Sequence, residues 1–353
     1  MYKTMLVAAA ALLACAAEAR AALYGYEGFN YAAGTLSGKG SASDPGFSTA
    51  WTQGTDGGNV VSGGLSYANL QTTGGALDLA GAGTTLNFRG LSQAYNDPSD
   101  TATGELWFSY LIQPGTYTGL PFAGLSFYTD QLTGSTATDT DFYLAARNVS
   151  PGNYGYGDLD AANGAQTPVI ATPGETVLLV GQIVFGAGAN TSATNEDHIY
   201  IYANPAIGGD IPAPDADTDL TADFQTMRLA AQNGANFLVD EFRIGDSFAD
   251  VTPVIPPDPN VDGAPGITLN DFQVIRTNFL TGTTHAQGDV NYDGLVDHAD
   301  FYLWRTSFLG TGATLEGVNL WGVPEPASGV AALVMTLAGG LVVRQARRAK
   351  RPA

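Results

Sequence analysis

The sequence predicts a mainly β protein whose largest part is an antiparallel β-sandwich. Three observations indicate this class. Glycine is abundant, at 45 of 353 residues, charged residues make up only 14%, and short apolar stretches alternate with turn-forming residues. Such a composition suits short strands joined by many turns better than long, solvated helices.

Four stretches within residues 22–251 carry the strand signal most clearly. In residues 104–112 apolar side chains occupy every second position, and residues 176–185 form the nearly continuous apolar run of a central strand. Residues 198–203 alternate isoleucine with tyrosine, and residues 238–244 close the region. No convincing amphipathic helix pattern appears among these stretches, so the region is expected to fold as one sandwich.

The charge of the chain excludes some partners and favours others. Residues 22–322 hold 7 lysines and arginines against 32 aspartates and glutamates, a formal charge of −25. Such a body repels nucleic acid and anionic lipid and attracts divalent cations, so no nucleic-acid partner is expected. The only cysteine, Cys15, lies in an apolar leader, so the mature chain must depend on its packed core and on bound metal rather than on disulfides.

Residues 1–21 are predicted to be a secretory signal peptide. Lys3 supplies the positive start, Met5 to Ala17 form the apolar stretch, and small residues follow. Cleavage after Ala19 and cleavage after Ala21 both fit the small-x-small rule. A lipidation box ending at Cys15 is a rival interpretation, but the leucine just before its small residue fits poorly.

The C-terminal residues 323–353 are predicted to be a second targeting signal, in addition to the signal peptide. The motif Pro324, Glu325, Pro326 precedes an apolar run from Ala327 to Val343 and a basic cluster that closes the chain. Seventeen apolar residues can span a bilayer, with the basic end in the cytoplasm, so a plain membrane anchor is one interpretation. The order of the three features resembles the PEP-CTERM sorting signal of Gram-negative bacteria. That resemblance implies transient anchoring, recognition and cleavage by an exosortase, and delivery to the cell surface, the extracellular polysaccharide matrix or the medium.

A proline-rich linker, residues 252–257, leads into an internal repeat. Residues 271–279 match residues 300–308 at five of nine positions, at an offset of 29 residues. An acidic loop precedes each copy, and apolar residues at helical spacing follow each loop. Two short helices that pack against each other are therefore expected within residues 258–312, with a further linker at 313–322.

The second loop has the pattern of a calcium-binding loop. Oxygen donors fall at loop positions 1, 3, 5, 9 and 12, Gly294 permits the sharp turn at position 6, and a backbone carbonyl supplies position 7. A metal-free Asp/Asn-rich turn fits this spacing poorly. The predicted ligands are Asp289, Asn291, Asp293, the carbonyl of Leu295, Asp297 and Asp300.

The first loop follows the same pattern less strictly. Two extra residues, within 264–266, separate its halves, so its calcium affinity should be the lower of the two. Its predicted ligands are Asp258, Asn260, Asp262, Thr268 and Asp271. Two calcium ions are thus expected in all.

The two loop–helix units resemble a type I dockerin domain over about residues 258–310. The resemblance implies the same calcium ligands, with Asp in place of the Glu usual at position 12 of EF-hands. Positions 10 and 11, which commonly read the partner in that family, are Leu269-Asn270 in one repeat and His298-Ala299 in the other. Because the two faces differ, two-way docking to a cohesin is in doubt. A cohesin-like partner, another protein partner and a purely local structural module all stay open.

Two short motifs indicate the type of β-sandwich. Residues 26–29 (Tyr-Glu-Gly-Phe) and 238–245 (Leu-Val-Asp-Glu-Phe-Arg-Ile-Gly) resemble those of laminin-G and concanavalin A-like jelly rolls in secreted bacterial proteins. The resemblance implies that the second motif forms the last strand and lies near the N-terminal strand. Such folds often bind glycans, but a fold alone does not give a function.

No catalytic constellation is found in the sequence. His198, His285 and His298 lack metal-ligand spacing, there is no Gly-x-Ser-x-Gly elbow, and no Glu-x-Asp-x-Glu run is present. The neighbouring Asp240 and Glu241 are expected on opposite faces of a strand, with Glu241 paired to Arg243. The protein is therefore predicted not to be an enzyme.

One segment is a candidate for sugar binding. Residues 152–160 present Tyr154, Tyr156, Asp158 and Asp160 on a glycine-rich stretch that is expected to be a loop. Aromatic faces beside carboxylates can stack on a sugar and hydrogen-bond to it, although an ordinary solvated loop has the same composition.

These observations predict an exported, calcium-stabilised, non-catalytic protein of the cell surface or matrix. Its expected role is carbohydrate binding, adhesion or structure, with extracellular polysaccharide as a partner. Two alternatives stay open: a polysaccharide-degrading enzyme or its accessory subunit, and a purely structural surface-layer component.

Overall fold

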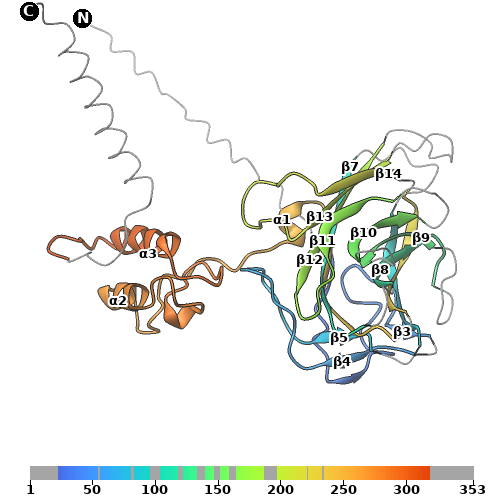
Figure 1. Cartoon of the computed structure of the whole chain (residues 1–353), viewed down its shortest axis with the longest axis horizontal. Coiled ribbons are helices and arrows are strands. Elements are labelled where there is room, and N and C mark those ends of the chain that lie inside the picture. The colour runs from blue at the N-terminus through green and yellow to red at the C-terminus, as the bar shows by residue number, and fades with distance from the viewer. Residues whose placement is uncertain are drawn as a thin grey trace, which may run out of the picture. The chain divides into compact units, whose positions relative to one another are not determined.

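The computed structural model divides the chain into two compact units (Figure 1). The first unit contains the residues up to Leu65 together with Thr72–Pro253, and the second contains Ser66–Gln71 together with the residues from Val254 onward. The structure describes residues 23–54, 56–80, 83–95, 104–117, 122–132, 140–146, 152–158, 164–186, 197–220, 222–232 and 234–318.

The first unit is a sandwich of two antiparallel sheets. The nine-stranded sheet has the order β14-β13-β12-β7-β16-β5-β4-β2, with β1 also paired to β16. Its strands are β1 (Leu23–Glu27), β2 (Gly34–Thr35), β4 (Asn59–Val61), β5 (Ala76–Asp78), β7 (Gly104–Pro114), β12 (Val177–Phe185), β13 (Asp197–Ala203), β14 (Ala216–Leu220) and β16 (Phe237–Gly245).

The seven-stranded sheet has the order β11-β10-β9-β8-β15-β6-β3. Its strands are β3 (Thr52–Gln53), β6 (Thr85–Tyr95), β8 (Ala123–Tyr128), β9 (Thr140–Ala146), β10 (Asn153–Asp158), β11 (Gln166–Ile170) and β15 (Phe224–Ala231). The predicted mainly β fold, with an antiparallel jelly-roll sandwich and a small helical part after it, is confirmed.

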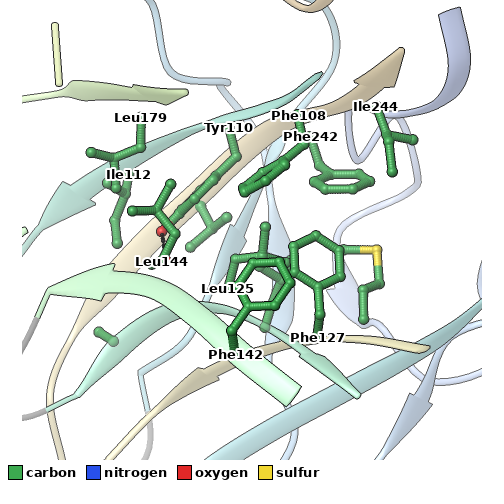
Figure 2. Close-up of a cluster of buried hydrophobic side chains, with 14 of the residues drawn as sticks. Phe108, Tyr110, Ile112, Leu125, Phe127, Phe142, Leu144, Leu179, Phe242 and Ile244 are labelled. Carbon is green, nitrogen blue, oxygen red and sulfur yellow. Dashed lines mark hydrogen bonds between the residues drawn. The ribbon is translucent and has the colours of Figure 1, made fainter. Parts of the chain in front are cut away.

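The core lies between the two sheets, and Figure 2 shows its centre. The alternation predicted for residues 104–112 is confirmed, because Phe108, Tyr110 and Ile112 of β7 all point into this core. The Tyr110 hydroxyl is fully buried and donates a hydrogen bond to the carbonyl of Leu144 at 2.5 Å, which satisfies its polar end. The apolar run at 176–185 forms β12, an interior strand between β7 and β13.

The two motifs at the ends of the sandwich lie side by side. Strand β1 pairs with β16, so that Tyr26 is opposite Arg243 and Glu27 is opposite Phe242, as the resemblance implied. The buried Glu27 carboxylate accepts hydrogen bonds from Trp51 Nε1 at 2.7 Å and from Arg89 Nη1 at 2.5 Å. Charge-assisted contacts of this kind compensate a buried carboxylate, so the first motif has a structural role.

One expectation for the second motif is wrong. Asp240 and Glu241 do not face opposite sides, because Glu241 adopts a φ of 57° at a bulge where the register of β16 shifts. Both carboxylates bind backbone N–H groups of one stretch of chain: Asp240 accepts from Leu65 and Glu241 from Thr73. The predicted pairing of Glu241 with Arg243 is confirmed as a buried ion pair.

The first unit ends with α1 (Phe248–Val251), and the second unit contains α2 (Leu269–Thr277), the short 3-10 helix η1 (His285–Gln287) and α3 (His298–Gly310). Both longer helices begin with a capping box, formed by Thr268 and Asp271 in α2 and by Asp297 and Asp300 in α3. Their apolar faces enclose a separate core, as predicted, made of Val261, Phe272, Ile275, Val290, Val296, Phe301, Trp304 and Phe308.

Two predicted segments lie outside the described residues. They are the signal peptide 1–21 and the tail 323–353 with its motif Pro324, Glu325, Pro326. Among the helices that the structure does describe, none has both the length and the apolar character needed to cross a membrane.

Candidate functional site

The second acidic loop is closed by the side chain of its last residue. Asp300 is fully buried at the start of α3, and its carboxylate accepts N–H groups from both ends of the loop. Oδ1 accepts from Val290 at 2.7 Å and from Asn291 at 3.2 Å, and Oδ2 accepts from Asp297 at 2.7 Å. Asp300, the residue expected to be the last calcium ligand, therefore links the two ends of the loop through hydrogen bonds.

The first residue of the same loop orders its turn. The Asp289 carboxylate accepts the N–H of Asp293 at 3.1 Å and of Gly294 at 2.9 Å. Gly294 has a φ of 86°, which a glycine adopts without strain, and this conformation carries the chain around the turn as predicted. Asn291 and Asp293 also bind one another, through Nδ2 and Oδ2 at 2.8 Å.

The electrostatics of this loop favour a cation. Burial removes the carboxylates of Asp289 and Asp300 from water and so raises their pKa values. Among the described residues, no cationic side chain pairs with either carboxylate. Donated N–H groups only partly offset this penalty. A divalent ion bound by these oxygens would remove it, which is the physical requirement for a hard-cation site.

The first loop is also closed by the carboxylate of its last residue, but the N–H groups that this carboxylate accepts come from different loop positions. Asp271 is fully buried, and its carboxylate accepts N–H groups from Asp262 at 3.0 Å and from Thr268 at 2.7 Å. The extra residues pass through Gly266, whose φ of 90° lets the chain take the detour. Asn260 Oδ1, one of the predicted ligands, is buried and has no hydrogen-bond partner among the described residues, an arrangement that suits a cation better than a dry interior.

The predicted ligands of each loop thus lie near one another, but their side chains are not arranged around a common metal position. Within the described part of the chain, no group of three or more His, Cys, Asp or Glu side chains has the geometry to hold a metal ion. The carboxylates of Asp271, Asp289 and Asp300 bind backbone N–H groups instead. The calcium ligands expected from the sequence stay a prediction.

The two loops are joined by their shared core. Trp304 of α3 stacks on Phe272 of α2, with ring centroids 5.1 Å apart, and its Nε1 donates to the carbonyl of Thr268 at 3.0 Å. His285 of η1 lies between the loops, with Nδ1 3.2 Å from the carbonyl of Asp289 and Nε2 3.3 Å from that of Asn260. The loops therefore form one unit.

The prediction of an exposed sugar-binding loop around Tyr154 and Tyr156 is wrong. Residues 153–158 form strand β10, and Tyr154 and Tyr156 are only 0% and 1% exposed. Glycines alternate with these tyrosines, so both rings fall on the core face of the strand, where Tyr156 packs on Phe142. Asp158 ends the strand, and Asp160 lies outside the described residues.

A different surface offers a partly exposed aromatic ring, that of Tyr200, together with polar groups. It lies on strands β14, β13, β12 and β7, on the face of the sheet that points away from the core. Four cross-strand neighbours form a row across these strands: Trp107, Gln182, Tyr200 and Asp217. We call this surface the outer row, together with the adjacent Glu105, His198 and Asp219. The sequence alternation placed Tyr200 opposite the core, which is the signal that could have identified this surface.

Side-chain contacts hold the outer row in place. His198 bridges two carboxylates of β14, with Nδ1 2.8 Å from Asp219 and Nε2 3.0 Å from Asp217. Its ring centroid lies 4.6 Å from that of Tyr200. On the other side of the row, Gln182 donates to Glu105 at 3.0 Å. A partly exposed aromatic ring can stack on a sugar, and the carboxylates and the amide beside it can accept hydrogen bonds from the sugar hydroxyl groups.

Comparison with known proteins gives similarity of structure only. No protein-family model matches the chain, and no curated protein matches it in sequence. Three structurally similar chains are the globular domain of T. cruzi calreticulin, peanut lectin with a 9mer peptide, and domain 4 of AbnA, a GH43 extracellular arabinanase from Geobacillus stearothermophilus, in complex with arabinotriose.

All three likenesses are distant. The calreticulin domain is 13% identical with a TM-score of 0.40, over 65% of this chain and 90% of that one. Peanut lectin is 10% identical with a TM-score of 0.33, over 63% and 97%, and the arabinanase domain is 16% identical with a TM-score of 0.34, over 66% and 97%. None of these values transfers a ligand or an activity to this chain.

Proposed function

We propose that the protein is an exported, non-catalytic protein of the cell surface or extracellular matrix, in which calcium orders the second unit and the sandwich binds carbohydrate. The leader and the tail of the sequence support the export. The calcium part rests on one observation above all, namely that both acidic loops are closed by a buried carboxylate, Asp271 or Asp300, without a cationic partner among the described residues.

The duplicated design supports two ions. Asp271 and Asp300 stand at equivalent positions of the repeat, cap equivalent helices and gather N–H groups of their own loops. The second loop is the stronger candidate, because its spacing is that of a continuous twelve-residue calcium loop and both its first and last carboxylates are buried. In the first loop Asp258 is exposed, which favours weaker binding.

The carbohydrate part rests on the outer row. Tyr200 is a partly exposed ring on β13, which is paired on both sides, and His198, Asp217 and Gln182 around it are held by side-chain contacts. Preorganised groups lose little conformational entropy on binding, and an aromatic ring provides the apolar contact that a sugar face requires. This surface replaces the segment 152–160 as the proposed ligand site.

Retention of the exported protein on immobilised polysaccharides, in calcium, tests this function. Selective retention that falls about tenfold or more for Tyr200→Ala is expected, because burial of an aromatic side chain is worth roughly 1.5–3 kcal/mol. Tyr302→Ala is the matched control, since Tyr302 is exposed on α3 in the other unit. Release of reducing ends from the same panel would instead favour the polysaccharide-degrading alternative.

Absence of retention on every polysaccharide would overturn the carbohydrate part. The calcium part is tested separately, by counting bound ions calorimetrically. Calcium binding without any glycan binding would favour the purely structural surface-layer alternative.

A further inference from the structure

Arg228 occupies an unusual place in the seven-stranded sheet. It lies in β15, between β8 and β6 at the middle of the sheet, and its neighbours Met227 and Leu229 point into the core. Because side chains alternate along a strand, Arg228 points to the opposite, outer face. There it is half-buried, with Nη2 donating to Ser126 Oγ at 2.9 Å.

Among the described arginines of the sandwich, Arg228 differs from Arg89 and Arg243 because no carboxylate compensates its charge. Arg89 pairs with Glu27 and Asp44, and Arg243 pairs with Glu241. Within the described residues no carboxylate pairs with Arg228, and its Nε is buried without a hydrogen-bond partner. Burial lowers the pKa of the Arg228 guanidinium, which expresses the same penalty on its charge.

Aromatic rings surround the guanidinium. Its Cζ lies 5.1 Å from the ring centroid of Tyr128 and 5.5 Å from that of Phe122. Phe122 in turn meets Tyr143 edge to face, with centroids 5.3 Å apart, and both of these rings are only partly buried. Cation–π contacts stabilise a desolvated cation in part, but they satisfy none of its N–H groups. Nε is buried and Nη2 already donates to Ser126, so the Nη1 and Nη2 end of the guanidinium is the end that an anion can approach.

We propose that Arg228 marks a binding site for the carboxylate of an acidic sugar residue, with the rings of Phe122 and Tyr143 beside it to contact the sugar face. This inference rests on the proposed carbohydrate-binding function and adds a second site, on the other sheet from the outer row. The guanidinium fork matches a planar carboxylate in two parallel hydrogen bonds.

The test uses the exported protein, with both units present, and short oligosaccharides that do not gel with calcium. The probes are oligogalacturonate and oligomannuronate, each compared with its carboxyl-reduced, neutral form at one fixed calcium concentration. Three variants are compared with the wild type. Arg228→Gln removes the charge, Arg228→Lys keeps the charge without the fork, and Arg305→Gln makes the same charge change on the exposed surface of α3.

The wild type is expected to bind at least one oligouronate at least about tenfold more tightly than its reduced form, as expected for a charge-assisted pair of hydrogen bonds. Arg228→Gln should lose that preference, Arg228→Lys should keep part of it, and Arg305→Gln should keep all of it. Calcium that bridges the glycan carboxylates to the acidic surface contributes equally in all variants, so the difference between the wild type and Arg228→Gln reports on the Arg228 site alone. Unchanged near-ultraviolet circular dichroism would show that Arg228→Gln still folds.

Two outcomes would overturn this inference. One is equal binding of acidic and reduced glycans by the wild type, and the other is an unchanged preference in Arg228→Gln. If neutral glycans are still retained in a way that depends on Tyr200, the proposed function stands while the Arg228 site fails. If no glycan binds at all, both fail.

Discussion

Replacement of Asp300 by Asn is the most direct perturbation of the second calcium loop. The substitution keeps the size of the side chain and removes its charge. An amide retains one acceptor oxygen for the N–H groups of Val290 and Asn291, but it presents an NH₂ group to the N–H of Asp297. One buried donor then loses its partner, while the burial penalty on the carboxylate charge disappears.

These two effects oppose one another in the absence of calcium. An unpaired buried donor costs about 1–3 kcal/mol, and relief of the charge offsets part of this, so the calcium-free variant should be close to the wild type. In calcium the two proteins should differ strongly. An ion present at 100 times its Kd stabilises the folded state by about 2.7 kcal/mol, and the variant should lose that increment. For a unit of this size the loss corresponds to about 10–20 °C in Tm.

Differential scanning calorimetry in calcium and in chelator measures this difference, and titration calorimetry counts the ions. The variant should bind one ion where the wild type binds two. Asp271→Asn should remove the other, weaker ion, and Asp210→Asn, at an exposed position of the sandwich, should change neither number. If Asp300→Asn still bound two ions with an unchanged calcium-dependent Tm, the assignment of Asp300 as a ligand would be refuted.

Three further predictions concern one core residue, Trp304, and two buried carboxyl groups, those of Glu27 and Asp240. Trp304→Ala, at a fully buried ring, should destabilise the second unit by about 3–5 kcal/mol and leave the sandwich transition in calorimetry unchanged; a shift of both transitions would contradict this. Glu27→Gln should destabilise the sandwich by about 3–5 kcal/mol, because Arg89 loses a buried partner, whereas the exposed Glu105→Gln serves as the control; equal effects would refute the role of Glu27. Burial raises the pKa of Asp240 from its ordinary value of 3.8 to about 8, so the folded state holds a proton that the unfolded chain releases. The free energy of unfolding should fall as the pH rises from about 4 to about 8, and denaturant unfolding of Asp240→Asn should show a weaker fall; an identical slope would contradict the shift.

Much of the sandwich could be predicted from the sequence, because strand patterns are local. The alternation around Phe108 and the apolar run of β12 depend only on which side chains face a core, and both were correctly located. The helices after the acidic loops were predictable for the same reason. The spacing of Phe272 and Ile275, and of Phe301 and Trp304, follows the helical period.

The errors arise where local composition is ambiguous. Alternating glycine and tyrosine in β10 has the composition of a flexible loop, yet the two tyrosines share one face and their burial depends on partners elsewhere in the chain. The bulge at Glu241 could not be predicted either, since a non-glycine residue with positive φ is held there by contacts with Thr73, Tyr26 and Arg243. The assignment of Ser66–Gln71 to the second unit likewise has no signal in the sequence.

The strand order also sets the sequence of events by which the sandwich can assemble. The last two strands of the chain, β15 and β16, lie in the interior of their sheets: β15 separates β8 from β6, and β16 separates β7 from β5. Among the described strands, each sheet therefore stays divided into unconnected parts until residues 224–245 are available. The seven-stranded sheet is left in two parts and the nine-stranded sheet in three, since β1 pairs with β16. A chain that emerges N-terminus first cannot complete either sheet early, and its many long-range pairings make closure slow. Such a delay would suit the export proposed above, in which the chain crosses a membrane before it folds.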